Sequence, residues 1–583
     1  MRKLLLAAAA LLPLAACATP GERGGGTAAP VTVRLIGLND FHGNLEPPGV
    51  SVDHPAPGEG AARVPAGGAA HLASAVRALR AQGPHSLVLS AGDMIGASPL
   101  VSALFLDEPT IAAMNLVGVD YNAVGNHEFD RGRAELLRMQ RGGCGKNTTR
   151  EPCAVEPFAG ARFPFLSANV WKEDGTPLFA PYAIRSFGRG AARVKVAIVG
   201  ATVKETPTLV TPAGVAGLRF GDEAEAVNAL VPELKAKGAD AIVVLIHQGA
   251  RTSGGYSDAN CPGLEGDILP ILDRLDPAVD AVVSGHTHRA YVCDYARTGA
   301  AKPLLLTSAG RYGTLVTDIA LEIDPAAGQV VAKRARNLIV QGEGFAAAPN
   351  TDAVPRFPAE PGVAALVARY AAAARPVAAR PVGRLSAPAA RTNNEAGESV
   401  LGNLVADAQL AATRGAGAQV ALMNPGGLRA DIAPDPRGDV SFGQLFAAQP
   451  FANLLVVKTL TGRQLRALLE QQFASGTNSA EQPNVLSPSA NLSFAYDLTR
   501  PAGARIAALT IDRRPVRDEE RYRVAVNSFL SGGGDNFTVL REGADPVGGA
   551  VDVDALEAYF RARPVVTPPA LGRVRRVDSP ASR

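Results

Sequence analysis

Residues 121–130 read YNAVGNHEFD, and no other ten residues of the chain are as informative. A short apolar run ending at Val124 leads into a glycine, and the five residues after it contain an amide, an imidazole and two carboxylates. These groups bind metals or carry protons, and a structural loop rarely needs so many of them together. The stretch therefore predicts a strand that ends at a functional site, for which other segments must supply partners.

The same pattern of a strand followed by polar side chains recurs along the first half of the chain. Strands are predicted at 31–38, 86–90, 194–199, 241–246 and 281–283, with helices at 68–80, 223–237 and 267–275. This alternation predicts an α/β sandwich. Metal-type side chains stand just past five predicted strands, at Asp40, His42, Asp93, Asn126, His247, His286 and His288.

Each of these residues also has an ordinary explanation as a turn or capping residue. However, five of the eight histidines in the chain fall in these strand-end segments. The C-terminal ends of strands are also where α/β sheets build their sites. We therefore expect the strand ends to meet at one edge and to form a single site.

These segments resemble the calcineurin-like metallophosphoesterases. The motifs occur in the order of that family over about residues 31–340: Asp-x-His at 40–42, Gly-Asp at 92–93, Gly-Asn-His-Glu at 125–128, His247, and Gly-His-Thr-His at 285–288. The resemblance implies two divalent metal ions. Asp40, His42 and His288 would hold one ion, Asn126, His247 and His286 the other, and Asp93 would bridge them. Such mixed oxygen and imidazole ligands suit zinc, manganese, cobalt or iron.

The resemblance also implies the chemistry of the opening stretch. Two metal ions would clamp a phosphoryl group and activate a hydroxide for attack on phosphorus. His127 would stabilise the transition state or protonate the leaving oxygen, and Asp130 would orient and charge its imidazole. Glu128 is expected to have a structural role.

A second α/β region follows a stretch rich in alanine, proline and glycine at about 341–381, in which a helix is predicted at 363–374. This region contains no histidine, and glycine-rich loops and phenylalanines are weak evidence by themselves. Its motifs nevertheless resemble the C-terminal domain of 5′-nucleotidases. In that family, residues matching Phe451 and Phe529 sandwich the nucleobase, and such stacking contributes ~1–3 kcal/mol per base.

The same resemblance implies further substrate contacts. Arg391 and Arg429 match arginines that lie near anionic oxygens of the substrate. The spacing at Arg391 requires a gap, and Pro425 stands where many relatives carry glycine. Residues that match the loops contacting base or ribose are Asn424, Gly427, Asn453 and Asp535.

The N-terminus predicts export. Arg2 and Lys3 precede an apolar run that is too short for a mature membrane-spanning helix and that ends at Leu-Ala-Ala-Cys17. This ending resembles a bacterial lipobox, in which the cysteine is acylated; the alternative is an ordinary secretory signal. No aspartate follows Cys17 to indicate retention in the inner membrane. We expect a periplasmic or cell-envelope protein, with the outer membrane favoured and the lipidated Cys17 as its only membrane contact.

Four further cysteines are consistent with export. An even number suggests disulfide bonds, for which three pairings are possible. The local pairs Cys144–Cys153 and Cys261–Cys293 are expected. A zinc–thiolate site is the competing interpretation, but the chain contains no C-x-x-C pair.

Length and composition set the remaining limits. A chain of 583 residues is too long to fold around a single hydrophobic core. Its content of 47% hydrophobic and 19% charged residues is typical of a globular protein. A net charge of +3 without a basic run gives no indication of a nucleic-acid polymer as partner. We predict a monomer with a signal peptide (1–17), a tether (18–30), a metallophosphoesterase domain (31–345), a linker with a connecting helix (346–380) and a substrate-binding domain (381–575).

The sequence thus predicts an enzyme that hydrolyses nucleoside 5′-monophosphates outside the cytoplasm, for nucleotide scavenging. Cyclic nucleotides, nucleotide sugars and nucleoside di- or triphosphates would use the same metal ligands, so they stay open as substrates. A relative that acts on sulfur-oxyanion conjugates shares the architecture, and Phe451 with Phe529 argues against it. A catalytically silent nucleotide-binding lipoprotein is the alternative of another class, and the complete set of ligand residues argues against it.

Overall fold

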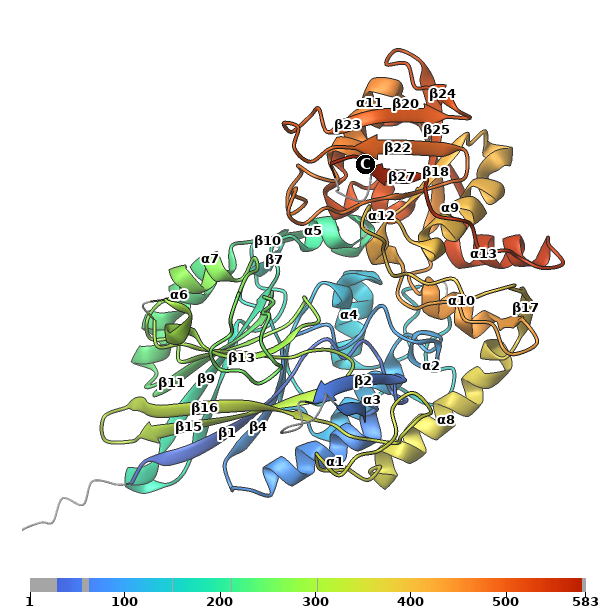
Figure 1. Ribbon diagram of the computed structural model, residues 1–583. Coiled ribbons are helices and arrows are strands. Elements are labelled where there is room, and N and C mark those ends of the chain that lie inside the picture. The colour runs from blue at the N-terminus through green and yellow to red at the C-terminus, as the bar shows by residue number, and fades with distance from the viewer. Residues whose placement is uncertain (1–28, 55–61, 149, 211, 301, 579–583) are drawn as a thin grey trace, which may run out of the picture.

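The chain forms two halves joined by the long helix α8 (Pro361–Ala378), as Figure 1 shows for a computed structural model that describes residues 29–54, 62–148, 150–210, 212–300 and 302–578. The predicted signal peptide and Cys17 lie outside the described residues. The N-terminal half ends with α8, and the C-terminal half begins at β17 (Pro381–Arg384).

Two six-stranded sheets form the centre of the N-terminal half. The first has the order β16 (Gln329–Ile339), β15 (Leu315–Asp324), β1 (Val31–Leu38), β4 (Ser86–Ser90), β5 (Tyr121–Ala123) and β6 (Phe165–Leu166). The second has the order β13 (Ala290–Asp294), β14 (Leu305–Ala309), β12 (Ala281–Ser284), β11 (Ala241–His247), β9 (Val194–Thr202) and β8 (Tyr182–Phe187). Strands β1, β4, β5 and β6 run parallel, as do β9, β11, β12 and β14.

The two sheets pack face to face over a buried apolar layer that includes Leu35, Leu89, Ile198, Val243 and Val283. Helices cover both outer faces, which explains why the central strands are almost continuously apolar: they are buried on both sides. The first sheet is covered by α1 (Ala69–Arg80), α3 (Glu108–Val117), α4 (Gly132–Arg141) and α8. The second is covered by α6 (Glu223–Ala236) and α7 (Leu269–Arg274). The predicted α/β sandwich is confirmed.

Helix α8 is longer than the predicted helix and packs against α1 and α3 (Figure 1). It begins at Pro361 because proline suits the first helical position, and the Glu360 side chain caps it by accepting from the backbone N–H of Val363 at 2.8 Å. The buried side chains of Leu366 and Tyr370 attach α8 to the first half. The segment that connects the halves is therefore a packed helix at this point.

The C-terminal half contains a five-stranded and a four-stranded sheet. The larger has the order β21 (Ser487–Pro488), β18 (Val420–Met423), β25 (Arg521–Asn527), β20 (Leu454–Thr461) and β26 (Ala544–Val551). The smaller has the order β24 (Arg514–Pro515), β23 (Ile506–Ile511), β22 (Leu492–Tyr496) and β27 (Val574–Arg576). Their helices are α9 (Val400–Thr413), α10 (Phe442–Ala448), α11 (Gly462–Glu470), α12 (Ser528–Ser531) and α13 (Asp552–Arg561).

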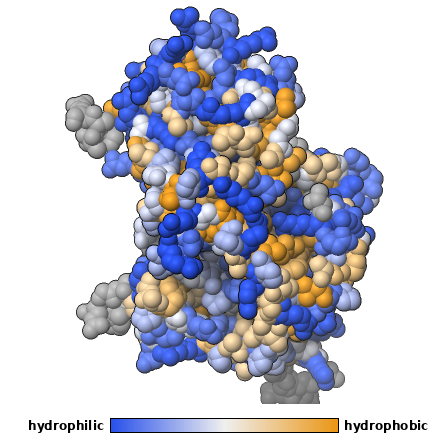
Figure 2. Space-filling model, turned by 90° about the vertical axis from the view of Figure 1, so that its right-hand side faces the viewer, coloured by the Kyte–Doolittle hydropathy of each residue, from blue (hydrophilic) through white to orange (hydrophobic). Residues whose placement is uncertain are grey.

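The described chain has seven further strands and α-helices, besides short 3-10 helices. They are β2 (Val50–His54), β3 (Ala62–Ala66), α2 (Leu100–Ala103), β7 (Val170–Lys172), α5 (Thr206–Leu209), β10 (Leu218–Phe220) and β19 (Asp439–Ser441). Among the described residues, no helix combines the length and apolar character needed to cross a membrane. Figure 2 shows that the upper part of the face carrying α8 is mostly hydrophilic, whereas apolar residues are interspersed at the waist and across the lower part.

The strand ends that carry the polar motifs come from both sheets of the N-terminal half. Strands β1, β4 and β5 belong to the first sheet, and β11 and β12 belong to the second. The expectation that all of these strand ends lie at the edge of one sheet is therefore corrected. They lie at the adjoining edges of two sheets that pack face to face. The layered packing, which no local sequence pattern specifies, produces this meeting.

Candidate active site

Six of the seven predicted ligand residues lie in turns after their strands, and the seventh, His247, is the last residue of β11. Five of them have backbone φ angles in the left-handed region: Asp40 (48°), His42 (46°), Asp93 (50°), His286 (71°) and His288 (58°). Residues other than glycine rarely adopt such angles, and they persist where the surrounding structure imposes them, most often at functional sites. The turns therefore direct these side chains inward at a cost in backbone strain.

The ligand residues form two adjoining groups. Asp40, His42 and His288 form one, and Asp93, His247 and His286 form the other, with the candidate ligand atoms of each group within 4.8 Å of one another. Asp93 lies between the groups, because its Oδ2 is 3.5 Å from Nε2 of His42 and 3.0 Å from Nε2 of His247. The seventh predicted ligand joins the second group: Oδ1 of Asn126 lies 3.1 Å from Nδ1 of His286.

The protonation of His42 and His286 fits a metal centre, whereas the neighbouring carboxylate of Asp93 outweighs burial and raises the pKa of His247 to about 10. Nδ1 of His42 is 2.9 Å from the carbonyl oxygen of Gly96, and Nδ1 of His247 is 2.8 Å from that of Ala91, so each Nδ1 carries the proton and each Nε2 turns inward. Nε2 of His42 then faces Nε2 of His288 at 3.0 Å. Burial lowers the pKa of both His42 and His286 to about 3, which keeps these imidazoles in the neutral form that binds metals. Nitrogen and oxygen lone pairs thus converge on positions suited to divalent cations.

Two buried residues hold the ligand turns in place. The carboxylate of Glu128 accepts hydrogen bonds from the backbone N–H groups of Gly125, Asp93 and Met94 at 2.8–2.9 Å, so it joins the turns after β4 and β5. This agrees with the structural role expected for Glu128. A Cβ at Gly125 would lie within 3.0 Å of both Asp93 and Glu128, which explains the glycine at the start of the opening stretch.

The second such residue is Asn39, which sequence reasoning missed. Its Nδ2 donates to Oδ2 of Asp40 at 2.7 Å and to the carbonyl oxygen of Gly310 at 2.7 Å, and its Oδ1 accepts from the N–H of Ala309. The signal was present, because Asn39 is a polar residue directly after the apolar end of strand β1 and directly before a candidate ligand.

His127 and Asp130 form a hydrogen-bonded pair beside the two groups. Nδ1 of His127 lies 2.9 Å from Oδ2 of Asp130, and the backbone N–H of His127 donates to Oδ1 of Asp93 at 2.9 Å. Burial opposes a charge on this imidazole, but the carboxylates of Asp130 and Asp93 outweigh that effect, and the pKa of His127 is raised. A protonated imidazole held in this way can act as a general acid.

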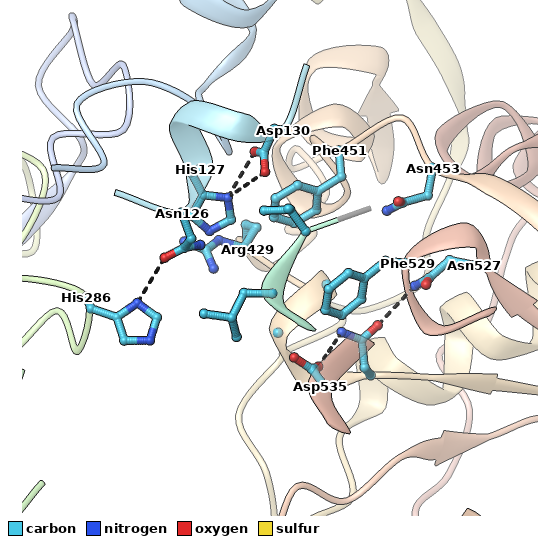
Figure 3. A pocket seen from close by; sticks show the side chains of 15 residues that line it. Asn126, His127, Asp130, His286, Arg429, Phe451, Asn453, Asn527, Phe529 and Asp535 are labelled. Atoms are coloured by element: carbon cyan, nitrogen blue, oxygen red, sulfur yellow. Dashed lines mark hydrogen bonds and ion pairs between the residues drawn. The ribbon is translucent and has the colours of Figure 1, made fainter. Parts of the chain in front are cut away.

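A cavity of about 150 Å³ lies between the two halves and opens onto this pair (Figure 3). Asn126, His127, Asp130 and His286 line it from the N-terminal half. The residues predicted for substrate binding that line it are Asn424, Gly427, Arg429, Phe451, Asn453, Phe529 and Asp535. Figure 3 shows Phe451 and Phe529 on one side and His286 on the other. Sequence reasoning missed Leu209, Val210, Gly426 and Asn527, which also line the cavity.

Arg391 is the one predicted substrate residue that does not line this cavity. Its backbone N–H donates to Asp431, and its Nη1 lies 3.4 Å from the carbonyl oxygen of Leu428. Arg391 instead neighbours Arg311, whose pKa its charge helps to lower.

The phenylalanines have different neighbours. The ring of Phe451 stacks on the imidazole of His127, with centroids 5.6 Å apart and planes 21° apart, and the guanidinium carbon of Arg429 is 5.8 Å from the centroid of the Phe451 ring. Phe529 lies against Gly534, where an added Cβ would be 2.5 Å from two atoms of the Phe529 ring. Phe451 is therefore linked to the His127–Asp130 pair, whereas the position of Phe529 depends on a glycine.

A hydrogen-bonded network fixes the polar end of the cavity. Nδ2 of Asn424 donates to Oδ2 of Asp535 at 2.8 Å, and Nδ2 of Asn527 donates to Oδ1 of Asn424 at 3.0 Å (Figure 3). Burial raises the pKa of Asp535. The hydrogen bonds among these side chains fix the orientations of the donors and acceptors that the protein presents to a ligand in the cavity.

Both expected disulfide bonds are present. Cys144 pairs with Cys153, and Cys261 pairs with Cys293. The loop closed by the first is anchored at Glu108, whose carboxylate accepts from the backbone N–H of Cys153 at 2.9 Å. The zinc–thiolate alternative is wrong for these four cysteines.

Comparison with known proteins agrees with both halves of the site. Residues 33–290 match the calcineurin-like phosphoesterase family, and residues 380–542 match the 5′-nucleotidase C-terminal domain. The chain is 29% identical over 535 residues to endonuclease YhcR of Bacillus subtilis and 29% identical over 542 residues to cell wall protein Lmo0130 of Listeria monocytogenes, covering 91% and 88% of this chain. It spans only 40% and 64% of the lengths of these relatives.

Among solved structures, the crystal structure of a 5′-nucleotidase precursor from Thermus thermophilus superimposes with a TM-score of 0.72 at 28% identity. The superposition covers 94% of this chain and all of that one. The fold and the order of the two halves are therefore shared over nearly the whole chain.

Proposed function

Because the chain belongs to the calcineurin-like phosphoesterases that also carry a 5′-nucleotidase C-terminal domain, we propose that it hydrolyses nucleoside 5′-monophosphates to nucleoside and phosphate. One observation supports this most directly. A single cavity between the halves brings two phenylalanine rings and a polar network to the edge of the metal-type group that contains His286. A ligand with an aromatic base at one end and a phosphate at the other fits these surroundings.

The ligand set suits two divalent ions, and their identity among zinc, manganese, cobalt and iron stays open. Asp40, His42 and His288 would hold one ion, while Asn126, His247 and His286 would hold the other. The position of Asp93 between the groups suits a bridging carboxylate. When bound, the two ions would supply Lewis-acid stabilisation of the phosphoryl charge and an acidified water as nucleophile.

The protein's own residues would act on the leaving group. With its Nδ1 held by Asp130, His127 can present a proton on Nε2 to the departing 5′ oxygen of the nucleoside. The raised pKa of His127 favours the protonated form before the reaction, as a general acid requires. Asp130 would be a positioning residue that keeps the proton on the correct nitrogen.

The C-terminal half would bind the nucleoside. Phe451 and Phe529 would stack on the base, and Asn424, Asn453 and Asp535 would bind base or ribose through the network described above. Gly427 keeps the adjoining turn open, because a Cβ there would meet the side chain of Met423 at 2.4 Å. Arg429 would lie against the phosphate or the leaving oxygen, beside His127.

We further infer that the protein acts outside the cytoplasm as a lipid-anchored monomer. The two disulfide bonds support export, because such bonds persist in oxidising compartments. Labelling with radioactive palmitate in wild type and in Cys17→Ala would test the anchor. An unlabelled wild-type protein would contradict it.

The experiment that tests the activity is a phosphate-release panel over nucleoside mono-, di- and triphosphates, cyclic nucleotides and nucleotide sugars. It is run on the full chain after chelation and again after addition of single divalent ions. We expect AMP to be cleaved only in the presence of a divalent ion. Cleavage of nucleotide sugars with no cleavage of AMP would refute the proposal.

A further inference from the structure

Asp107 is a fully buried acidic residue outside both the cavity and the two metal-type groups of the described chain. It stands directly before α3, where an aspartate commonly caps its own helix. Within the part of the chain that the structure describes, however, its side chain makes no capping hydrogen bond. Its φ angle of 63° lies in the left-handed region, which is uncommon for residues other than glycine. The side chain of Asp107 is therefore directed at partners outside its helix.

The carboxylate of Asp107 connects three segments of the N-terminal half. Its Oδ1 accepts a hydrogen bond from the hydroxyl group of Ser102 in α2 at 2.6 Å, and its Oδ2 accepts from the backbone N–H of Gly96 at 3.2 Å. Oδ2 also forms an ion pair with Arg131, the residue after Asp130. Burial opposes ionisation of Asp107, but Arg131 and the hydrogen bond from Ser102 outweigh it and lower its pKa. The charged form, which can only accept hydrogen bonds, is therefore favoured.

Gly96 links Asp107 to the candidate metal centre. Its carbonyl oxygen accepts from Nδ1 of His42 at 2.9 Å. Its φ angle is 83°, and an added Cβ would lie 2.3 Å from the carbonyl oxygen of His127 and 2.9 Å from Oδ2 of Asp130. The turn at Gly96 is therefore packed between a candidate ligand and the His127–Asp130 pair, so a shift of this turn would move the imidazole of His42.

The link reaches one metal-type group and not the other. With Nδ1 of His42 held by Gly96, its Nε2 faces Nε2 of His288 at 3.0 Å. In the other group, Nδ1 of His247 is held by the carbonyl oxygen of Ala91 at 2.8 Å instead. Partners that orient a metal-binding histidine typically contribute about 10–100-fold in metal affinity. Loss of the Gly96 restraint should therefore weaken the binding of one ion selectively.

We propose that Asp107 is a positioning residue of the metal centre. By holding Gly96 it fixes the imidazole of His42, and so sets the affinity of the group formed by Asp40, His42 and His288 for its ion. The inference rests on the two-ion centre of the proposed function and deepens it. A merely structural role for this buried ion pair would affect both ions alike.

Binding of manganese to the full chain after chelation tests the proposal, because electron paramagnetic resonance counts the unbound ion. We expect wild type to bind two ions. Asp107→Ala should bind one of them about 10–100-fold more weakly and the other within threefold of wild type. Asp107→Asn should keep both affinities within threefold, because its amide oxygen can still accept from Gly96 while its NH₂ group donates to Ser102.

Asp120→Ala is the matched control. Asp120 likewise pairs with an arginine, Arg80, and accepts from a backbone N–H, that of Val88, at 2.8 Å, but it precedes β5 and so lies at the opposite end of that strand from the site. Its replacement should leave both affinities for manganese within twofold. In a His42→Ala background, Asp107→Ala should cause no further change beyond twofold, because both substitutions act through the same imidazole.

Thermal unfolding checks that each variant is folded. If Asp107→Ala does not fold, Asp107→Leu combined with Arg131→Met takes its place, since apolar side chains of similar size can replace a buried ion pair without loss of stability. Equal weakening of both ions, unchanged binding of both, or the same selective loss in Asp120→Ala would overturn the proposal. A wild-type protein that binds no manganese would refute the metal centre of the proposed function itself, and the proposal with it, so the two failures are distinguishable.

Discussion

Replacing Phe529 by alanine should weaken nucleotide binding without harming the chemistry. A base stacked on an aromatic side chain contributes ~1–3 kcal/mol, which corresponds to about a 5- to 150-fold change in affinity. Phe529 lines the cavity, and the His127 imidazole stacks on the other phenylalanine, Phe451. We therefore expect Phe529→Ala to raise KM for AMP by about 10- to 100-fold and to leave kcat within threefold.

The assay measures phosphate release from AMP and from 4-nitrophenyl phosphate, which has no base to stack. Phe529→Ala should leave kcat/KM for the aryl phosphate within twofold of wild type. Gly534→Ala is a matched second perturbation, because its new Cβ would lie 2.5 Å from the Phe529 ring and displace it without deleting it. It should raise KM for AMP in the same direction as Phe529→Ala.

Phe451→Ala provides the contrast. Since Phe451 stacks on His127 at 5.6 Å, its loss should lower kcat for AMP as well as raise KM. Thermal unfolding of each variant checks that the fold is retained. Equal losses on AMP and the aryl phosphate in Phe529→Ala, or an unchanged KM for AMP, would refute the stacking role.

Three further predictions concern the acid, the metals and a buried carboxyl group. His127→Ala should lower kcat for AMP by about 10²–10⁴-fold and should affect 4-nitrophenyl phosphate far less, because nitrophenolate leaves without a proton; equal losses would exclude a role in protonating the leaving group. Chelation should abolish activity, divalent ions should restore it in wild type but not in Asp93→Ala, and an active metal-free protein would exclude a metal mechanism. Burial raises the pKa of Asp552 to about 7 from its ordinary 3.8, so the stability contributed by the protonated group is present below pH 4 and is lost as the pH rises through 7. The Tm of Asp552→Asn minus that of wild type should therefore be a few degrees higher at pH 8 than at pH 4, which corresponds to about 1–2 kcal/mol of stability. The same Tm difference at both pH values would contradict this assignment.

The sequence alone predicted those features that depend on residues close together along the chain. Runs such as AIVVLI at 241–246 are apolar along their whole length and rich in β-branched residues, so they predict buried strands with nearly correct ends. A residue of a metal-binding type directly after such a run is therefore expected to lie at the C-terminal end of that strand. The predicted metal-type residues therefore meet in two groups, and the glycine before Asn126 stands where a side chain would collide with Asp93.

Helix α8 shows the limit of local patterns. Its first residues, Pro361 and Gly362, are typical of a linker, and the sequence alone predicted a shorter helix. The proline favours a helix start only because Glu360 caps it and because Leu366 and Tyr370 find an apolar surface on α1 and α3. The decisive contacts come from residues more than two hundred positions away.

The site also has some features that local sequence predicts and others that only the tertiary structure determines. Which residues are candidates to bind metal or to carry a proton could be predicted from residue type and position after a strand, because these are local properties of the chain. The contact of Phe451 with His127, the placement of Arg391 beside Arg311 rather than in the cavity, and the role of Asn527 in holding Asn424 were decided by tertiary structure alone. Each of these contacts joins residues about 80 to 325 positions apart. The meeting of the two halves brings the first two pairs together, and the pairing of β18 with β25 in one sheet brings Asn424 and Asn527 together.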